Sequence, residues 1–241
     1  MLNRIRRKLR HVMSRFQHRP PIGWVRFGSL RRLHPISSKF GYDRGTPIDR
    51  YYMETFLQSN QYDIKGRVLE IRDSAYTLKF GQTRVIVSDV LDIDAKNNRA
   101  TLIADLADAS HVPADLFDCI ICTQTLQMIY DVRSAVSHLY RMLKPDGVLL
   151  VTTHGTGMLD AGQCYCDYWR FTAASARKLF AEFFPLKNVQ VESHGNIFAL
   201  LAFLEGLALE EVRTKDLDYH DPRYELLITV RAIKPHAEIG A

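Results

Sequence analysis

Three carboxylates stand at or next to the ends of three successive apolar runs in the middle of the chain. Glu70 lies in the run RVLEI, Asp89 ends the run VIVSD, and Asp105 lies near the end of ATLIADL. A carboxylate can accept two hydrogen bonds from the hydroxyl groups of a ribose, and another can accept one from an adenine amino group. This order of acids is typical of a site for an adenosine-containing cofactor.

Polar and aromatic side chains follow the next two apolar runs. Thr123 and Gln124 come at the end of FDCIICT, and the long segment after GVLLVTT carries His154, Tyr168 and Arg170 as candidate catalytic residues. His154 could take the proton of a hydroxyl acceptor, although a single histidine at a strand end is more often structural. Aromatic core packing is the alternative for Tyr168 and its neighbours. Helix capping is the alternative for Thr123, which leaves Gln124 as the better ligand candidate.

The apolar runs also define the elements that must position these side chains. Several runs are continuously apolar, as strands that are buried on both faces must be. Strands are expected at 67–71, 84–88, 100–104, 117–123, 147–153, 187–193 and 224–232. Helices are expected at 48–59, 132–143, 172–183 and 198–212. This alternation predicts an α/β domain with a mostly parallel sheet.

A dense group of polar and aromatic side chains surrounds the start of the helix expected at 48–59. Its members are Asp43, Arg44, Asp49, Arg50, Tyr51 and Tyr52. One interpretation is a corner of ion pairs that satisfy one another. The other is a surface that faces a ligand.

The charge of the chain is unevenly distributed. Residues 1–42 contain eleven Lys and Arg residues and no acid, which leaves 21 basic against 27 acidic residues in the remainder. Residues 2–16 also place apolar side chains on one helical stripe. This arm, 1–19, could lie on an anionic membrane surface, bind an acidic partner or remain solvated. No nucleic-acid partner is expected, because the rest of the chain is acidic and lacks a binding motif.

The cysteines favour free thiols rather than a metal site. Cys119 and Cys122 fall in an expected core strand, and Cys164 and Cys166 fall in a loop without a second Cys/His pair at zinc-ligand spacing. Free thiols are typical of a reducing cytoplasm. No apolar run reaches the roughly 18 residues that a membrane helix needs. The chain is therefore predicted to be cytoplasmic and metal-free, with peripheral membrane contact through 1–19 as an open alternative.

The order of the motifs RVLEI, VIVSD, IADL, FDCIICTQTL, LYRMLKPDGVLLVTT and DYWRFT resembles the class I S-adenosylmethionine-dependent methyltransferases, particularly the type 11-like group. LKPDG matches that family's L-K-P-G-G turn except for Asp146. The resemblance covers about 64–235. It implies a Rossmann-like three-layer sandwich with a seven-stranded sheet of order 3-2-1-4-5-7-6, in which strand 7 is antiparallel. It also implies S-adenosylmethionine as cofactor, with Glu70, Asp89, Asp105 and Leu106 on its adenosine part.

One departure from the family pattern concerns the loop after RVLEI. The family has Gly-x-Gly-x-Gly there, whereas this chain has Arg72, Asp73 and Ser74 and no glycine before Gly81. Glycine tolerates positive φ and has no Cβ that would obstruct a ligand. Either Asp73 contacts the methionine ammonium group while Tyr76 packs beside the sulfonium, or Arg72 fills the pocket and the domain binds no cofactor. The first interpretation is favoured, because the ribose and adenine positions look intact.

The domains expected are the arm 1–19, a cover segment and helix 20–62, a methyltransferase-like domain 63–235 and a tail 236–241. The predicted function is methyl transfer from S-adenosylmethionine to a hydroxyl or carboxyl group of a small molecule or glycan. The alternative is a non-catalytic module of the same fold, docked on a membrane by 1–19. The apolar faces of the helix at 198–212 fit core packing, a lid or the contact of a homodimer.

Overall fold

The computed structural model describes residues 20–159 and 166–236. The chain divides into two units, Met1–Pro35 and Ile36–Ala241. The predicted arm 1–19 and almost all of the tail 236–241 lie outside the described residues. In the described part of the first unit, the regular structure is one short 3-10 helix, Gly28–Leu30.

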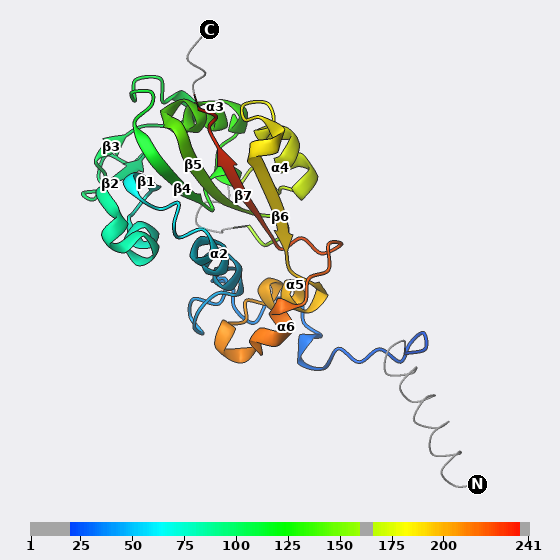
Figure 1. Cartoon of the computed structure of the whole chain (residues 1–241). Coiled ribbons are helices and arrows are strands. Elements are labelled where there is room, and N and C mark those ends of the chain that lie inside the picture. Colours follow the sequence, from blue (N-terminus) through cyan, green and yellow to red (C-terminus); the bar gives the residue numbers. More distant parts are fainter. Residues whose placement is uncertain (1–19, 160–165, 237–241) are drawn as a thin grey trace. The chain divides into compact units, whose positions relative to one another are not determined.

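The second unit is built on a seven-stranded sheet of order β3-β2-β1-β4-β5-β7-β6 (Figure 1). The strands are β1 Gly66–Ile71, β2 Val85–Asp92, β3 Leu102–Ile103, β4 Phe117–Thr123, β5 Leu143–His154, β6 Val189–His194 and β7 Leu227–Ile233. β1 to β5 are parallel to one another, and β7 runs antiparallel between β5 and β6. The predicted strand order and the antiparallel seventh strand are confirmed.

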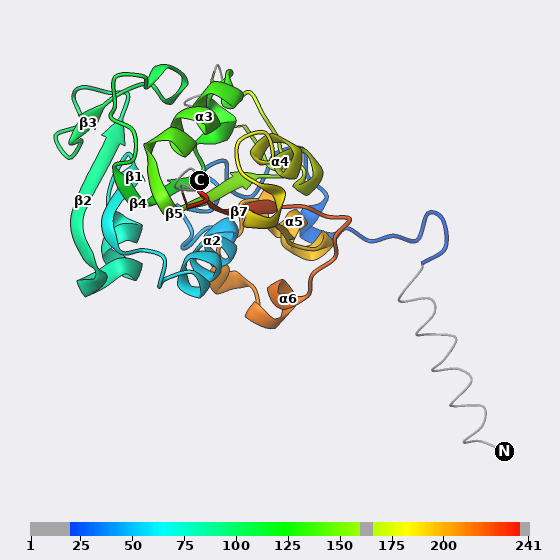
Figure 2. The ribbon, with the colours of Figure 1, turned by 45° about the horizontal axis from the view of Figure 1, so that its top comes forward.

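Helices cover both faces of the sheet and produce the predicted three layers (Figure 2). The helices α3 Val132–Met142 and α4 Ala173–Phe180 bury one core cluster against one face. The helix α2 Ile48–Ser59 covers the other face, with a second cluster that includes Leu57 and Val68. Because neighbouring residues of a strand point to opposite faces, Leu69 joins the first cluster and Val68 the second.

The predicted helix at 198–212 is wrong in extent. Helix α5 spans Ile197–Leu204, and the chain then passes through a 3-10 turn into the short helix α6 Thr214–Asp218. Gly206 ends α5 at φ 68°, and a Cβ there would lie 2.3 Å from the Ser37 carbonyl oxygen. The helix therefore stops where the chain needs glycine for a close approach to the segment that precedes α2.

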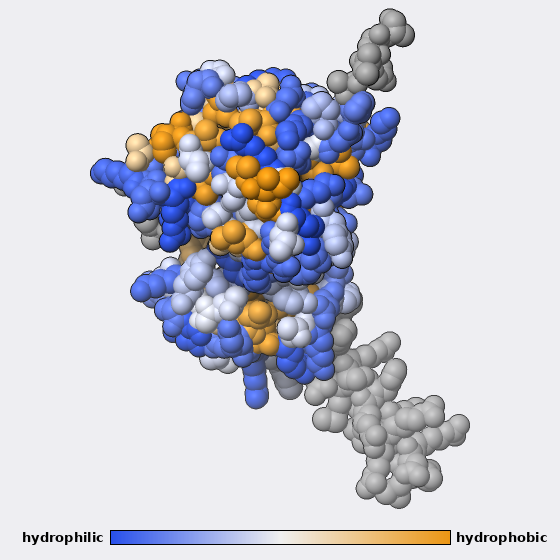
Figure 3. Space-filling model, turned by 60° about the vertical axis from the view of Figure 1, so that its left-hand side comes forward, coloured by the Kyte–Doolittle hydropathy of each residue, from blue (hydrophilic) through white to orange (hydrophobic). Residues whose placement is uncertain are grey.

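The connection between β2 and β3 has no helix. β2 extends to Asp92, four residues beyond its predicted end, and only residues 93–101 join it to β3. Parallel strands are usually joined by a longer, helical crossover. Without that helix the side chain of Ile86 on β2 remains 84% exposed. Figure 3 brings this side of the molecule forward and shows apolar surface there.

Within the described part of the chain, no helix has the length and apolar character needed to cross a membrane.

Candidate functional site

The strand order reverses between β1 and β4, and ligands of open α/β sheets bind outside the carboxyl ends of such strands. Arg72 directly follows β1 with φ 77°, and Gln124 directly follows β4 with φ 49°. Each non-glycine residue in this left-handed region costs on the order of 1–2 kcal/mol, and such strain gathers at functional sites. Two strained residues at the ends of paired strands mark this edge as the candidate site.

The backbone of Arg72 is fixed from two sides. Its N–H donates to the Leu91 carbonyl oxygen at 2.9 Å, and its own carbonyl accepts from Asn97 Nδ2 at 2.7 Å. The Asn97 amide also donates to Asp92 Oδ2 at 2.7 Å. The turn therefore takes the left-handed conformation that a glycine adopts readily, while the Arg72 side chain is exposed.

Glu70 fastens the rest of that loop. The carboxylate is only 2% exposed and accepts hydrogen bonds from the backbone N–H groups of Tyr76, at 3.1 Å, and Thr77, at 2.7 Å. Burial outweighs these hydrogen bonds and raises the pKa of Glu70 to about 7. In this structure the Glu70 side chain thus holds the protein's own backbone.

The prediction that a strand ends at Asp89 is wrong. Asp89 lies inside β2 opposite Leu69, and its carboxylate accepts from Arg67 Nε at 2.7 Å and from Thr101 Oγ1 at 3.0 Å. The acid at the carboxyl end of β2 is Asp92. The sequence contained a signal for it, because the apolar run continues through Val90 and Leu91.

Asp105 and Leu106 lie after β3, at the same edge. Asp105 is exposed and its Oδ1 accepts from the Ala107 N–H at 2.8 Å, which caps a 3-10 turn. The Leu106 side chain is buried. Asp73, in the loop after β1, similarly accepts from the Ala75 N–H at 2.9 Å.

The polar group around the start of α2 divides into two parts. Arg44 pairs with Glu211, Tyr51 bonds to Asp218 and Asp43 bonds to Ser37, as expected for a corner that satisfies itself. Asp49 and Arg50 instead face the sheet edge.

Arg50 joins α2 to the loop after β1. Its Nη1 donates to the Tyr76 hydroxyl at 2.9 Å and its Nη2 to the Tyr42 hydroxyl at 2.5 Å. Burial disfavours the Arg50 cation, but the neighbouring Asp49 charge and the two hydroxyls leave its pKa raised. Arg50 Nη1 and Gln124 Nε2 both lie 3.5 Å from Met53 Sδ, so a cation and an amide donor approach one point beside the end of β4.

His154 ends β5 and faces Asp49 across the edge. His154 Nε2 and Asp49 Oδ2 are 3.6 Å apart, and their side chains are 12% and 7% exposed. Asp49 Oδ1 and His154 Nε2 have no hydrogen-bond partner in the described part of the chain. The rings of Phe40 and Phe203 lie 6.4 Å and 5.6 Å from the imidazole ring, centroid to centroid. A buried acid and a partly buried histidine thus lie beside two aromatic rings, an arrangement that is rare unless it has a function.

Gln127 connects the ends of β4 and β5. Its Nε2 donates to Gln124 Oε1 at 2.9 Å, and its Oε1 accepts from Thr153 Oγ1 at 2.8 Å. Its carbonyl accepts from the N–H of Tyr168 at 2.8 Å. Thr123, the last residue of β4, pairs with Thr152 in the sheet.

Arg170 is engaged within its own loop. It forms an ion pair with Asp167 and donates to the Met158 carbonyl oxygen at 3.0 Å. These contacts give Arg170 a structural role in the loop after β5. Its catalytic role stays a prediction.

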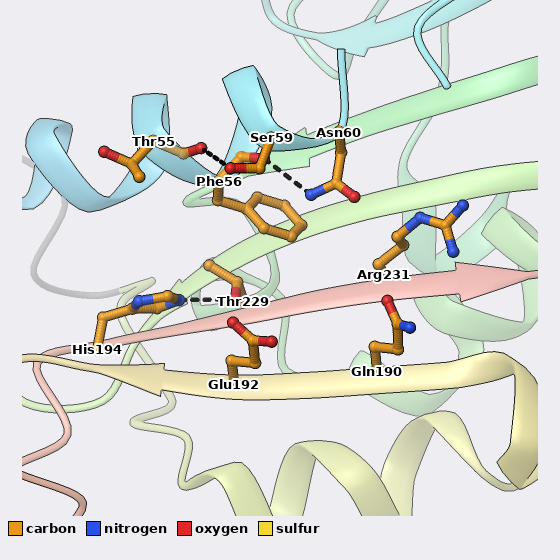
Figure 4. A pocket seen from close by; sticks show the side chains of 9 residues that line it. All are labelled: Thr55, Phe56, Ser59, Asn60, Gln190, Glu192, His194, Thr229 and Arg231. Carbon is orange, nitrogen blue, oxygen red and sulfur yellow. Dashed lines mark hydrogen bonds between the residues drawn. The ribbon is translucent and has the colours of Figure 1, made fainter. Parts of the chain in front are cut away.

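A separate polar groove of about 350 Å³ lies on the sheet face between α2 and the strands β6 and β7 (Figure 4). It is lined by Thr55, Phe56, Ser59, Asn60, Gln190, Glu192, His194, Thr229 and Arg231. Most of these groups bond to the protein itself, as His194 does to Thr229 at 2.9 Å. Within residues 20–159 and 166–236, no group of three or more His, Cys, Asp or Glu side chains could hold a metal ion.

A comparison with protein families shows the family of the chain. A family model described as a methyltransferase domain matches residues 38–194. The chain belongs to the methyltransferase family. The match supports S-adenosylmethionine, the cofactor expected from the sequence. It also spans α2, so Asp49 and Arg50 belong to the family domain.

Solved structures show the same fold. The [4+2]-cyclase SpnF is 16% identical with a TM-score of 0.53, over 85% of this chain and 88% of that one. The phosphoethanolamine N-methyltransferase 2 of Haemonchus contortus, in complex with S-adenosyl-L-methionine, is 16% identical with a TM-score of 0.51, over 87% of this chain and 55% of that one. At such identities the likeness concerns the fold alone. A search of curated proteins found no match.

The strain at Arg72 can be measured with two variants. Arg72→Gly should raise the free energy of unfolding by about 1 kcal/mol relative to Arg72→Ala, because both lose the side chain but only glycine relieves the positive φ. Urea unfolding of the two variants gives the difference. Arg99, in the loop after β2, is a control without positive φ, and there the glycine variant should be the less stable one. An Arg72→Gly variant no more stable than Arg72→Ala would contradict the strain.

The buried Glu70 should make stability depend on pH. Its pKa is near 7 in the folded protein and near 4.5 unfolded, so the folded state holds the proton more tightly and stability falls as pH rises between these values. Between pH 5 and pH 8 the wild-type protein should lose about 2.5 kcal/mol relative to Glu70→Gln. Urea unfolding at both pH values measures this, with Glu192→Gln as an exposed control. A constant difference between wild type and Glu70→Gln would rule out the shift.

Proposed function

We propose that this protein transfers the methyl group of S-adenosylmethionine to a hydroxyl group of a small molecule or glycan. The observation that carries the proposal is the pair of partly buried His154, at the carboxyl end of β5, and buried Asp49, on α2. A carboxylate acceptor needs no proton removed, whereas a hydroxyl acceptor does. The pair therefore favours a hydroxyl among the acceptors expected from the sequence.

The side chains at the edge fit the chemical groups of the cofactor. Asp92, at the end of β2, suits the ribose hydroxyls, and Asp105 with Leu106 suits the adenine ring. The Arg50 cation and the Gln124 amide suit a carboxylate, and Asp73 suits an ammonium group. The left-handed turn at Arg72 keeps the backbone path that a ligand would need after β1. When bound, S-adenosylmethionine supplies an electrophilic methyl group on a sulfonium.

The chain's own residues then remove a proton from the acceptor and exclude water. His154 takes the proton of the acceptor hydroxyl, and the Asp49 carboxylate stabilises the imidazolium that forms. Phe40 and Phe203 exclude water from this pair, which strengthens the interaction between the two charges. Tyr76 lies in the loop after β1 and is assigned to the cofactor. Arg50 donates to its hydroxyl, and its ring stacks on Phe80 with ring centroids 6.0 Å apart.

A non-catalytic module of the same fold is the second candidate. Arg72 favours it, because a charged side chain stands where the family has glycine. The exposure of that side chain favours the enzyme instead. Cytoplasmic location, membrane contact through 1–19 and a homodimer remain predictions from the sequence.

Cofactor binding is tested by calorimetric titration with S-adenosylmethionine and S-adenosylhomocysteine. We expect binding that Asp92→Asn weakens by about 1.5–3 kcal/mol, the usual loss for a hydrogen bond to a charged group. Asp146→Asn, at the opposite edge of the sheet, is the control and should bind as the wild type does. Absence of binding by the wild type would remove the enzyme proposal. If Arg72→Ala alone gained binding, Arg72 would be an obstruction and the non-catalytic candidate would stand.

The base is tested by transfer of labelled methyl groups from S-adenosylmethionine to pools of hydroxyl-bearing small molecules and glycans. His154→Gln should lower the transfer rate by roughly 10²–10⁴-fold with unchanged cofactor affinity, because only proton removal is lost. Asp49→Asn should have a smaller effect in the same direction. The exposed His236→Gln should match the wild type. Equal transfer by His154→Gln and wild type would exclude His154 as the base.

A further inference from the structure

Three aromatic side chains form an exposed cluster beside the candidate site. Tyr130, Tyr168 and Trp169 are 70%, 48% and 38% exposed. Tyr130 stacks on Trp169 with ring centroids 5.8 Å apart and meets Tyr168 edge-to-face at 5.4 Å. This aromatic platform keeps a large apolar area in contact with water, which is unfavourable unless a ligand covers it.

Hydrogen bonds within the protein hold the Trp169 indole and the backbone of Tyr168 and Trp169. Trp169 Nε1 donates to the carbonyl oxygens of Ile129, at 3.0 Å, and Tyr130, at 3.2 Å. The backbone N–H groups of Tyr168 and Trp169 both donate to the Gln127 carbonyl oxygen. Aromatic rings fixed in this way offer contact area with little entropy left to lose on binding.

The platform stands at the same sheet edge as His154. The Phe171 N–H donates to the His154 carbonyl oxygen at 2.9 Å, and Trp169 precedes Phe171 by two residues, a Cα distance of at most about 7 Å. Gln127, which holds Trp169, also accepts from Thr153. A ligand on the platform would thus lie near the strand end that carries His154.

We propose that the aromatic platform binds a sugar ring of an oligosaccharide acceptor, next to the sugar that is methylated. This rests on the proposed function and selects a glycan from its acceptor classes. A flat aromatic acceptor is expected in an enclosed apolar pocket, whereas the platform is open to water. A sugar suits it, because its C–H face packs on a ring while its hydroxyls stay hydrated or bond to the tyrosine hydroxyls.

The chain offers a direct probe, because its only two tryptophans are Trp24 and Trp169. Trp24→Phe leaves Trp169 as the sole fluorescent tryptophan. This protein is titrated with maltotriose, cellotriose, chitotriose and mannotriose, and with catechol as an aromatic comparator. We expect at least one trisaccharide to shift the Trp169 emission to shorter wavelength. Tyr130→Ala in the same background should raise its Kd by roughly threefold to tenfold. Tyr219→Ala, a similarly exposed tyrosine elsewhere, should leave it unchanged.

The outcomes separate this proposal from the proposed function. No trisaccharide response at millimolar concentration, a response to catechol alone, or equal loss in Tyr130→Ala and Tyr219→Ala would each overturn it. Calorimetry with S-adenosylmethionine runs on the same proteins, and Tyr130→Ala should bind it as the wild type does. Cofactor binding without a trisaccharide response would remove only the platform. A trisaccharide response without cofactor binding would remove only methyl transfer.

Discussion

The turn that follows β1 sets the geometry of the whole edge. Arg72 must adopt a left-handed backbone so that the chain can return over the end of β2, where Asn97 binds it and Asp92 together. The Glu70 carboxylate then accepts hydrogen bonds from the backbone N–H groups of Tyr76 and Thr77, later in the same loop. Because the hydrogen bonds from Asn97 and to Glu70 act on the backbone, the turn forms although this chain lacks the glycines of the family pattern. Asp146 follows the same principle, since it has φ 64° where the family's turn has glycine.

Much of the fold could be predicted because it depends on short patterns of apolar residues along the chain. Buried strands appear as apolar runs, and their order along the chain matched that of a known family. The ends of strands were harder to predict, because they depend on pairing with neighbouring strands and not only on the apolar run. Asp89 looked terminal, but β2 pairs with β1 as far as Leu91 and with β3 at Asp92. No helix was predicted between the strands at 84–88 and 100–104, and residues 93–101 contain none.

The site was predicted least well where it depends on residues far apart in the sequence. His154 stood out at a strand end, but Asp49 had no recognisable relation to it before folding brought α2 over the edge. Gln127 is similar, because its role consists of hydrogen bonds to three segments. Arg170 was predicted from its residue type and its place in the loop, and its catalytic role stays a prediction. Asp167 and the Met158 carbonyl engage it within the loop.

The segment before α2 is held by the far end of the chain. The Ser37 N–H donates to the Glu205 carbonyl oxygen. The N–H and the hydroxyl of Thr46 donate to the Glu210 carboxylate, and the Thr46 carbonyl oxygen accepts from the Leu209 N–H. Contacts so distant in sequence form late in folding, after the intervening chain exists. A nascent chain that has been synthesised only through α4 therefore contains His154 but lacks the surface that holds Asp49 opposite it. The His154–Asp49 pair is therefore assembled only after residues 205–210 have been synthesised.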